Sequence, residues 1–368
     1  MSTTLSYSSK RNPVISLIKD DEVIHKIACI GDPHLGRVFK TGVPSDRVGE
    51  REKSLYNTFH KLMNPTDPLV KDVVVVGDLF DKFIVSPTVV LTAYNIILKA
   101  YNDNPNVRYT IIPGNHDLSK DTSKKSSYEL LYNLLFTLSV GSERLITLLN
   151  HPKYTTIDNE DGSINTVLAF DCYNPFPEHR WSFEDMSAEC WKEAENIITF
   201  GHWDSLDIIE SGYTPSQELL DGSTLVVSGH EHSYKFYNYP FDVNNNPVLF
   251  TGSMQPYSHA EDPEGWIYVT IDQDELEDYD LSTLKYKCVR IYCDNTFALT
   301  NPIDCLSLSY LYKESEIVED TQEEDIQSLD DSYSARMTSI ISAIKSDTGY
   351  EEDILEIFKE KGYLNVSN

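Results

Sequence analysis

Basic residues are scarce in this sequence of 368 residues. It contains 30 lysines and arginines against 59 aspartates and glutamates, which gives a formal net charge of −29. This balance argues against a protein that coats nucleic acid by bulk electrostatic attraction, and against an anionic membrane surface as its partner. It leaves open a nucleic-acid enzyme in which metal ions and local basic loops attract the substrate.

The six cysteines include no CxxC pair, which disfavours a zinc knuckle or a redox motif. We interpret them as small buried residues in a reducing compartment. The sequence also has no 18-residue apolar run, and its first residues lack the apolar stretch of a signal peptide. We therefore expect a soluble, cytoplasmic protein that does not associate with a membrane.

Short runs rich in valine, isoleucine and tyrosine are typical of buried strands. They lie at 24–30, 72–76, 107–112, 166–170, 196–200, 224–228, 247–250 and 266–271. Ser86 and Pro87 favour the start of a helix that reaches about Tyr101, and Ser126 and Glu129 have capping-box spacing before an apolar run. Strands alternate with helices in the first half and dominate afterwards, which predicts an α/β fold, a β-sandwich flanked by helices.

The composition changes near residue 314. Nine of the 18 residues from Glu314 to Asp331 are acidic and none is basic, and beyond them apolar residues recur at helical spacing. We therefore divide the chain into an N-terminal extension (1–23), a main domain (24–272), a cap or accessory region (273–313), an acidic linker (314–331) and a helical tail (332–368).

Five short segments directly follow predicted strands and gather five of the ten histidines. They are Gly31-Asp32-Pro33-His34, Gly77-Asp78-Leu79-Phe80-Asp81, Gly114-Asn115-His116-Asp117, Gly201-His202 and Gly229-His230-Glu231-His232. The ends of strands in α/β sheets meet at the crevice where ligands bind. Any one segment is an ordinary turn, but five in order indicate a shared site. Their aspartate, asparagine and histidine ligands, without thiolate, suit manganese, iron or magnesium.

In this order the motifs resemble the calcineurin-like metallophosphoesterase superfamily, and within it the nuclease branch of SbcD-type subunits and the small subunits of T-even phage recombination endonucleases. The resemblance covers roughly residues 24–272, including Trp203 and the stretch from Thr251-Gly252-Ser253 to Glu264-Gly265-Trp266. It implies a metallophosphoesterase-type sandwich and hydrolysis of DNA by two divalent ions, with Mn²⁺ favoured and Mg²⁺ or Fe²⁺ as alternatives. It also favours a phage source, which would place the protein in the host cytoplasm.

The resemblance implies a role for each matching position. One ion is expected at Asp32, His34, Asp78 and His232, and the second at Asp78, Asn115, His202 and His230, with Asp78 bridging. His116 is expected to protonate the leaving oxygen, with Asp81 orienting and charging its imidazole. The alternatives are a loop histidine and a helix-start carboxylate. The other five histidines are interpreted as surface or core residues.

Two loops after the motifs carry basic residues that could hold DNA phosphates, which are Arg37, Lys40 and Arg51 in one and Lys124 and Lys125 in the other. The alternative is ordinary solvated charge. Weak net basicity predicts poor DNA affinity by this chain alone. The tail resembles the region that binds an SbcC-type SMC-like ATPase, although it could also fold back on its own domain. A homodimer is a further possibility in this family.

Two other functions remain open. One is a metallophosphoesterase that acts on small nucleotides or phosphomonoesters. A Ser/Thr protein phosphatase is disfavoured because Lys82 stands where that family has arginine, and Asp117 where it has glutamate. The other is a non-catalytic binding protein or acidic DNA mimic, which the net charge favours and the complete ligand set disfavours.

Overall fold

The computed structural model describes residues 2–118, 121, 124–136, 146–174, 190–204, 213–238 and 247–313. The chain divides into two units, residues 1–312 and 313–368. The acidic linker and the helical tail expected from residue 314 onward lie outside the described residues. Within the described residues, no helix combines the length and apolar character needed to cross a membrane.

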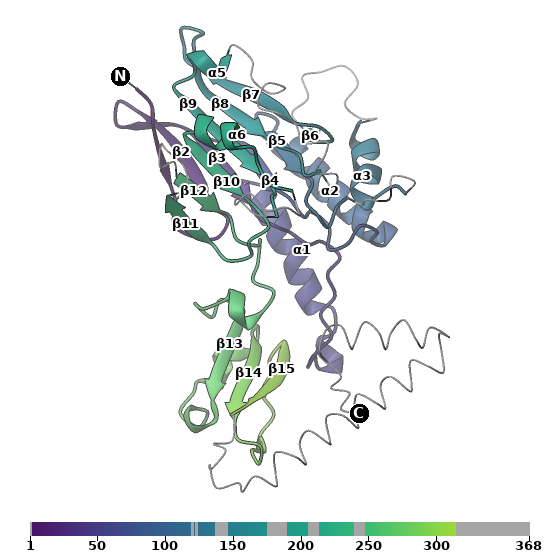
Figure 1. The fold of residues 1–368 in the computed structure, drawn as a ribbon. Helices are drawn as coiled ribbons and strands as arrows, with labels where there is room; N and C mark the ends of the chain where they lie inside the picture. The colour runs from purple at the N-terminus through teal and green to yellow at the C-terminus, as the bar shows by residue number, and fades with distance from the viewer. Residues whose placement is uncertain are drawn as a thin grey trace, which may run out of the picture. The chain divides into compact units, whose positions relative to one another are not determined.

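Two six-stranded sheets form the main body (Figure 1). The first has the order β1 (Thr4–Tyr7), β2 (Val14–Lys19), β3 (Glu22–Ile30), β4 (Val70–Val76), β5 (Arg108–Ile112), β6 (Ile146–Leu148). The second has the order β11 (Lys235–Asn238), β12 (Pro247–Phe250), β10 (Leu225–Ser228), β9 (Asn196–Gly201), β8 (Ile164–Phe170), β7 (Lys153–Asp158). Strands β3 to β6 are parallel, as are β8, β9, β10 and β12.

Successive side chains of a strand point to opposite faces, and here both faces of each sheet are covered. In β4, Val74 and Val76 pack into the core between the two sheets, together with Phe200 of β9. Val73 and Val75 point the other way and pack against helices. Because both faces are buried, such strands are continuously apolar, and this made them recognisable in the sequence.

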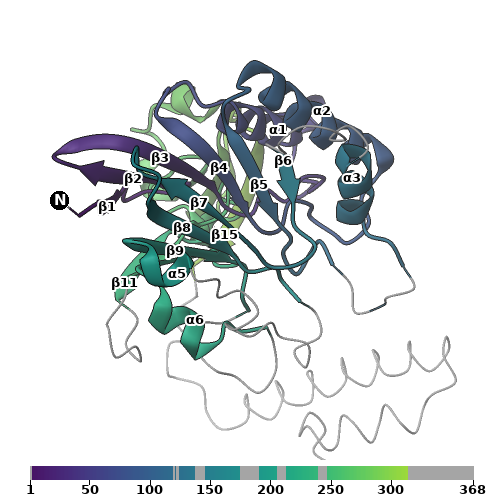
Figure 2. The same ribbon diagram turned by 90° about the horizontal axis from the view of Figure 1, so that it is seen from above.

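Helices cover the outer face of each sheet (Figure 2). The first sheet carries α1 (Glu50–Met63), α2 (Pro87–Asp103) and α3 (Ser127–Phe136), and the second carries α5 (Cys190–Glu193) and α6 (Gln217–Gly222). The predicted capping box is present, because the Ser126 hydroxyl accepts the Glu129 N–H at 3.0 Å and the Glu129 carboxylate accepts the Ser126 N–H at 2.9 Å. The predicted α/β sandwich flanked by helices is confirmed.

The N-terminal residues belong to the first sheet, which corrects their description as an extension. Strands β1 and β2 pair antiparallel, and β2 pairs with β3. Ile15 and Leu17 of β2 are fully buried between the sheets. The apolar residues of β2 are interrupted by Ser16 and end at Lys19, so its run is shorter than that of β3, which set the boundary at residue 24.

A third sheet, the accessory sheet, consists of the parallel strands β13 (Tyr268–Asp272), β14 (Cys288–Cys293) and β15 (Ser307–Tyr312). One face packs on its own apolar core, which includes Ile271, Val289 and Ile291. The accessory region therefore begins with β13, a few residues before the expected boundary at 273. Short 3-10 helices lie at Ser45–Arg47, His259–Glu261, Gln273–Glu275 and Leu281–Leu284.

Candidate metal centre

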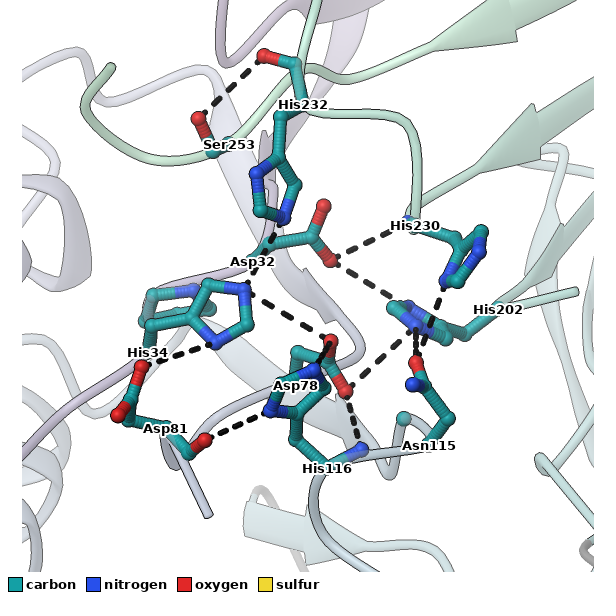
Figure 3. A network of polar contacts seen from close by, with 12 residues as sticks. Asp32, His34, Asp78, Asp81, Asn115, His116, His202, His230, His232 and Ser253 are labelled. Atoms are coloured by element: carbon teal, nitrogen blue, oxygen red, sulfur yellow. Dashed lines mark hydrogen bonds and ion pairs between the residues drawn. The ribbon is translucent and has the colours of Figure 1, made fainter. Parts of the chain in front are cut away.

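The five motifs lie in loops at the carboxyl ends of β3, β4, β5, β9 and β10. Parallel strands end at the same edge, and the two sheets bring these edges together. Figure 3 shows the result, in which the side chains of all seven predicted ligands and of His116 surround a common space. The seven are Asp32, His34, Asp78, Asn115, His202, His230 and His232.

Asp78 lies at the middle of this group, between His34 on one side and His202 on the other (Figure 3). Its Oδ2 lies 3.7 Å from Nε2 of His34, and its Oδ1 lies 3.5 Å from Nε2 of His202. Among the described histidine, cysteine, aspartate and glutamate residues, two sets have ligand atoms close enough to hold an ion, and both contain Asp78; they are His34, Asp78 and His116, and Asp32, Asp78 and His202. A carboxylate in this position can bridge two cations.

On the first side, Nε2 of His34 and Nε2 of His232 are only 3.1 Å apart. Burial and the neighbouring His232 lower the pKa of His34 well below its usual value. His34 is therefore neutral, which is the form that binds metal ions. Two imidazole nitrogens directed at one point, next to the Asp78 carboxylate, match the donors that the first ion needs.

On the second side, Oδ1 of Asn115 lies 2.9 Å from Nε2 of His202 and 3.2 Å from Nδ1 of His230. Nδ1 of His202 lies 3.1 Å from the Val76 carbonyl oxygen, which can only accept a hydrogen bond. Nδ1 therefore carries the proton, and Nε2 faces Asn115 and Asp78. Burial opposes a charge on His202, but the carboxylates of Asp78 and Asp32 raise its pKa to about 10. A divalent cation bound here would neutralise the negative charge of these two carboxylates.

An unsatisfied buried oxygen shows that this donor set fits metal ions. Within the described residues, Oδ2 of Asp32 is buried and accepts no hydrogen bond. A buried carboxylate oxygen without a partner is costly, so such atoms call for a ligand. Burial raises the pKa of Asp78, and the nearby charge of Asp32 adds to the rise. Cations bound between these oxygens and imidazoles would remove both penalties.

Four of the ligand residues adopt left-handed backbone conformations that residues with a side chain rarely take. The φ angles are 28° at Asp32, 45° at His34, 45° at Asp78 and 72° at His230. Each costs on the order of 1 kcal/mol, and such strain concentrates at functional sites. Glycine precedes Asp78 for a steric reason, because a Cβ at Gly77 would lie 1.9 Å from Nδ1 of His202.

His116 lies at the open side of the centre, with its side chain 42% exposed and its Nε2 4.0 Å from Oδ2 of Asp78. It faces a cavity of about 550 Å³ that Arg37, Asp81 and Lys82 also line. Nδ1 of His116 lies 2.6 Å from the backbone carbonyl oxygen of Asp81. This corrects the role expected of the Asp81 side chain. The N–H of Asp81 donates to the Leu35 carbonyl, and this turn directs the Asp81 carbonyl toward His116.

The carboxylate of Asp81 has other neighbours. Its Oδ1 lies 3.4 Å from Nη1 of Arg37 and 3.8 Å from Nδ1 of His34. It can therefore hold Arg37 near the cavity, whereas its distance from His34 is too long for a hydrogen bond; the contact of Asp81 with the ring of His116 is made by its backbone carbonyl.

Asp117 connects two of the motif loops, a role that the sequence analysis did not assign. Its carboxylate accepts the N–H groups of Leu79 and Phe80 at 2.9 Å and that of Gly114 at 3.0 Å. Burial and the neighbouring Asp78 raise the pKa of Asp117 to about 7. The bonds fix the turn after Asp78 against the loop that carries Asn115 and His116. In the sequence, the position of Asp117 within the GNHD motif is what points to this role.

Residues that are distant from one another in the sequence hold His232 and its loop in place. Oε1 of Glu261 lies 3.4 Å from Nδ1 of His232, so Nε2 remains directed at His34. Arg11 donates from Nη1 to the His232 carbonyl at 2.6 Å and from Nη2 to the Glu261 carbonyl at 2.6 Å. The Tyr257 hydroxyl lies 2.9 Å from the carbonyl of Asp32, to which it donates. Glu261 and Tyr257 lie within the stretch from Thr251 to Trp266 that carries the family resemblance, but nothing in the sequence near Arg11 indicates its role.

The basic residues predicted to bind substrate have different environments. Arg37 is half-buried and Lys40 is exposed, and both line cavities. Arg51 is 3% exposed, and its guanidinium donates to the Gln255 side chain and the Pro256 carbonyl. This corrects its assignment to a basic loop, because Arg51 lies on the inner face of α1, a helix that the sequence analysis missed. Lys124 and Lys125 are exposed and form ion pairs with neighbouring acidic residues.

Comparisons with known proteins agree with this geometry. The sequence model of the calcineurin-like phosphoesterase family matches residues 25–234, which include all seven predicted ligands and His116. No curated protein matches the chain. A solved structure described as GAP50, the anchor in the inner membrane complex of Plasmodium, is 15% identical with a TM-score of 0.35, over 62% of this chain and 71% of its own. The family match covers more than half of the sequence, and the chain belongs to the calcineurin-like phosphoesterase family of metal-dependent hydrolases.

Proposed function

We propose that the chain is a DNA nuclease subunit that hydrolyses phosphodiester bonds with two divalent ions, preferably Mn²⁺. The observation that carries the two-ion part is the position of Asp78, whose two oxygens face separate sets of ligands. The choice of DNA rests on the resemblance of the motifs and of the segment after Thr251 to SbcD-type nucleases. Divalent ions at such a centre activate water and neutralise the charge of a phosphate.

The chain's own residues would handle the proton of the leaving group. Because Nδ1 of His116 donates to the Asp81 carbonyl, Nε2 is the atom that faces the reacting phosphate and can hold a proton for the leaving oxygen. The partial exposure of His116 leaves room for a strand to approach. Arg37 lies beside it, where its charge can attract a phosphate.

The test is degradation of end-labelled linear duplex DNA and of single-stranded DNA by the purified chain in Mn²⁺. We expect cleavage that EDTA abolishes and that the His116→Gln variant lacks. A panel of cyclic nucleotides and phosphomonoesters runs in parallel. Turnover of this panel without cleavage of any DNA would favour the alternative function in small-nucleotide hydrolysis and contradict the nuclease proposal.

We further propose that the region 332–368 docks on an SMC-like ATPase subunit of the SbcC type, which supplies DNA affinity that the acidic chain lacks. The complex would act in recombination, repair or DNA processing in the cytoplasm. If the chain is encoded by a phage, this would be the cytoplasm of the host cell. Co-purification of the ATPase with the full chain but not with a chain ending at residue 313 tests this docking. Equal recovery with both chains would contradict it, and light scattering of the chain alone would test for a homodimer.

A further inference from the structure

The accessory sheet has one face that does not pack on its own core. Arg290 of β14 lies opposite Thr270 of β13 and Ser309 of β15, and Cys288 lies opposite Ser307. Residues opposite one another, and residues two apart along a strand, share a face of a sheet. The apolar residues between them form the opposite face, which is buried. Arg290 is therefore at the centre of the second face, where Thr270, Ser307 and Ser309 are its polar neighbours.

This second face forms one wall of a groove, and the loop that begins at Arg37 forms the other. The N–H of Leu308 in β15 donates to the Gly42 carbonyl at 2.8 Å. A Cβ at Gly42 would lie 2.0 Å from the Leu308 carbonyl oxygen, so the loop and the strand are in close contact there. Next to this contact lies a cavity of about 310 Å³, which we call the Arg290 groove; Arg37, Lys40, Tyr257, His259, Arg290 and Ser309 are among its lining residues.

The charge of the Arg290 groove is opposite to that of the chain. Its lining includes Arg37, Lys40, Arg51 and Arg290 and no aspartate or glutamate, although acidic residues outnumber basic ones by 59 to 30 in the sequence. Arg37 is paired with Asp81 outside the groove, whereas the partners of Arg51 are neutral oxygens, so the charge of Arg51 is not cancelled. Lys40 and Arg290 form no ion pair with any described residue. A concave surface lined by one sign of charge concentrates the field and attracts anions.

Two observations connect the groove to an extended anion at the metal centre. Arg37 lines both the Arg290 groove and the cavity that His116 faces, so the two are adjacent. The field in the groove also acts on a neighbour, because burial and the charge of Arg290 lower the pKa of His259 to about 4. An anion with a single phosphate at the metal centre leaves the groove unused, whereas a chain of phosphates can occupy both.

We propose that the Arg290 groove binds the phosphate backbone of a nucleic-acid strand next to the bond that is cut. This inference deepens the proposed nuclease function and rests on it. It assigns a part of the substrate site to the accessory sheet, which lies outside the segment that the family model matches. Backbone contacts of this kind hold a strand without reading its sequence. The groove thereby provides local affinity in a chain whose net charge repels DNA.

The test is binding of a fluorescein-labelled, nuclease-resistant phosphorothioate dodecamer of thymidine to the Mn²⁺-loaded full chain, measured by anisotropy over a range of salt. We expect Arg290→Gln to weaken binding several-fold, and the slope of log K against log salt to become shallower by about 0.7 for the lost contact. Arg290→Lys keeps the charge and should retain most of the affinity. Lys61→Gln removes an exposed charge from α1 and should behave as wild type. Melting temperatures confirm that the variants fold.

The outcomes separate this proposal from the proposed function. An Arg290→Gln variant that binds with unchanged affinity and salt slope overturns the groove assignment, even if the wild type cuts DNA. No binding of the dodecamer by the wild type also overturns it. If binding depends on Arg290 but the wild type cleaves no DNA while it hydrolyses bis(p-nitrophenyl) phosphate, the groove assignment holds and the nuclease function fails.

Discussion

Nδ1 of His116 lies 2.6 Å from the main-chain carbonyl oxygen of Asp81, and the Asp81 carboxylate lies instead beside Arg37 and His34. A carbonyl oxygen can only accept a hydrogen bond, so this contact fixes the proton on Nδ1 and turns Nε2 toward Asp78. The orientation of the proposed proton donor therefore depends on the path of the backbone and not on a second side chain.

We accordingly expect different results from substitutions of the two residues. His116→Gln should lower kcat for an unactivated dinucleotide such as thymidylyl-thymidine by about 10²- to 10⁴-fold, the usual contribution of a general acid, because the sugar oxygen leaves poorly without a proton. Its Mn²⁺ content, measured by elemental analysis, should equal that of the wild type. Asp81→Asn keeps the backbone carbonyl and should lose much less activity. An equal loss in both variants would show that the carboxylate is needed for proton transfer.

Asp78→Ala should prevent the binding of both ions, because the two ligand sets share only this side chain. Asn115→Ala is the matched comparison, because the Oδ1 atom of Asn115 lies beside His202 and His230, on one side of Asp78, and its loss should affect one ion. Elemental analysis after gel filtration gives the metal content per chain. Equal metal loss in the two variants would contradict a bridging role for Asp78.

Glu261→Gln should weaken Mn²⁺ binding by about 10- to 100-fold, the usual effect of removing a carboxylate that orients a ligand histidine. The amide cannot hold Nδ1 of His232 as a charged acceptor does. Titration calorimetry of the metal-free chain with Mn²⁺ measures the change. Glu264→Gln, an exposed carboxylate three residues further on, is the control and should bind Mn²⁺ as the wild type does.

Asp72 provides a pH-dependent part of the stability, away from the metal centre. Its carboxylate accepts two hydrogen bonds from Arg108 at 2.8 and 2.9 Å and lies 2.6 Å from Nε2 of His25. Burial alone would raise the pKa of Asp72, but hydrogen bonds from His25 and Arg108 lower it below its usual value. A folded-state pKa below the unfolded one means that the stabilisation is complete above the unfolded value, about 3.9. It is lost as the pH falls through the lower, folded-state value.

Asp72→Asn should therefore reduce the free energy of unfolding by about 1–3 kcal/mol at neutral pH, because it leaves Arg108, whose side chain is 30% exposed, without its charged hydrogen-bond acceptor. The difference from the wild type should shrink below about pH 4, as the wild-type carboxyl becomes protonated. Urea unfolding at several pH values measures both. A difference that stays constant with pH would show that packing, and not charge, stabilises this cluster.

The ligand set could be predicted from sequence because each ligand lies one to four residues after a buried strand. The strands are recognisable from their apolar runs. Because parallel strands end at the same edge of a sheet, their ends can be expected to lie close together even when no side-chain contact is known. Gly77-Asp78 and Gly229-His230 each directly follow such a strand, and this position marks them as candidate site residues. Strand β13 was predicted from the apolar run at 266–271, whereas β14 and α1 were not, because their apolar residues are interrupted by charged ones, such as Arg290 between Val289 and Ile291.

The supporting residues could not be predicted, because their partners are distant in the sequence. Arg11 bonds a carbonyl 221 positions away, and no local pattern marks such a contact. Arg51 seemed a solvated basic residue because the sequence does not show that α1 turns it toward Gln255 and Pro256. Which atom of Asp81 meets His116 likewise depends on the direction of one peptide group, which residue identities do not specify.

The residues that hold the metal ligands in place extend beyond the segment that the family model matches. The match spans residues 25–234, whereas Arg11 and Asn12 bind the site from before it and Tyr257 and Glu261 from after it. A recombinant fragment trimmed to the shared segment would keep every predicted ligand and still lose the scaffold of His232. Domain boundaries placed at the ends of the family match would thus separate the ligands from the residues that support them. A fragment for expression should therefore retain the residues before 25 and after 234.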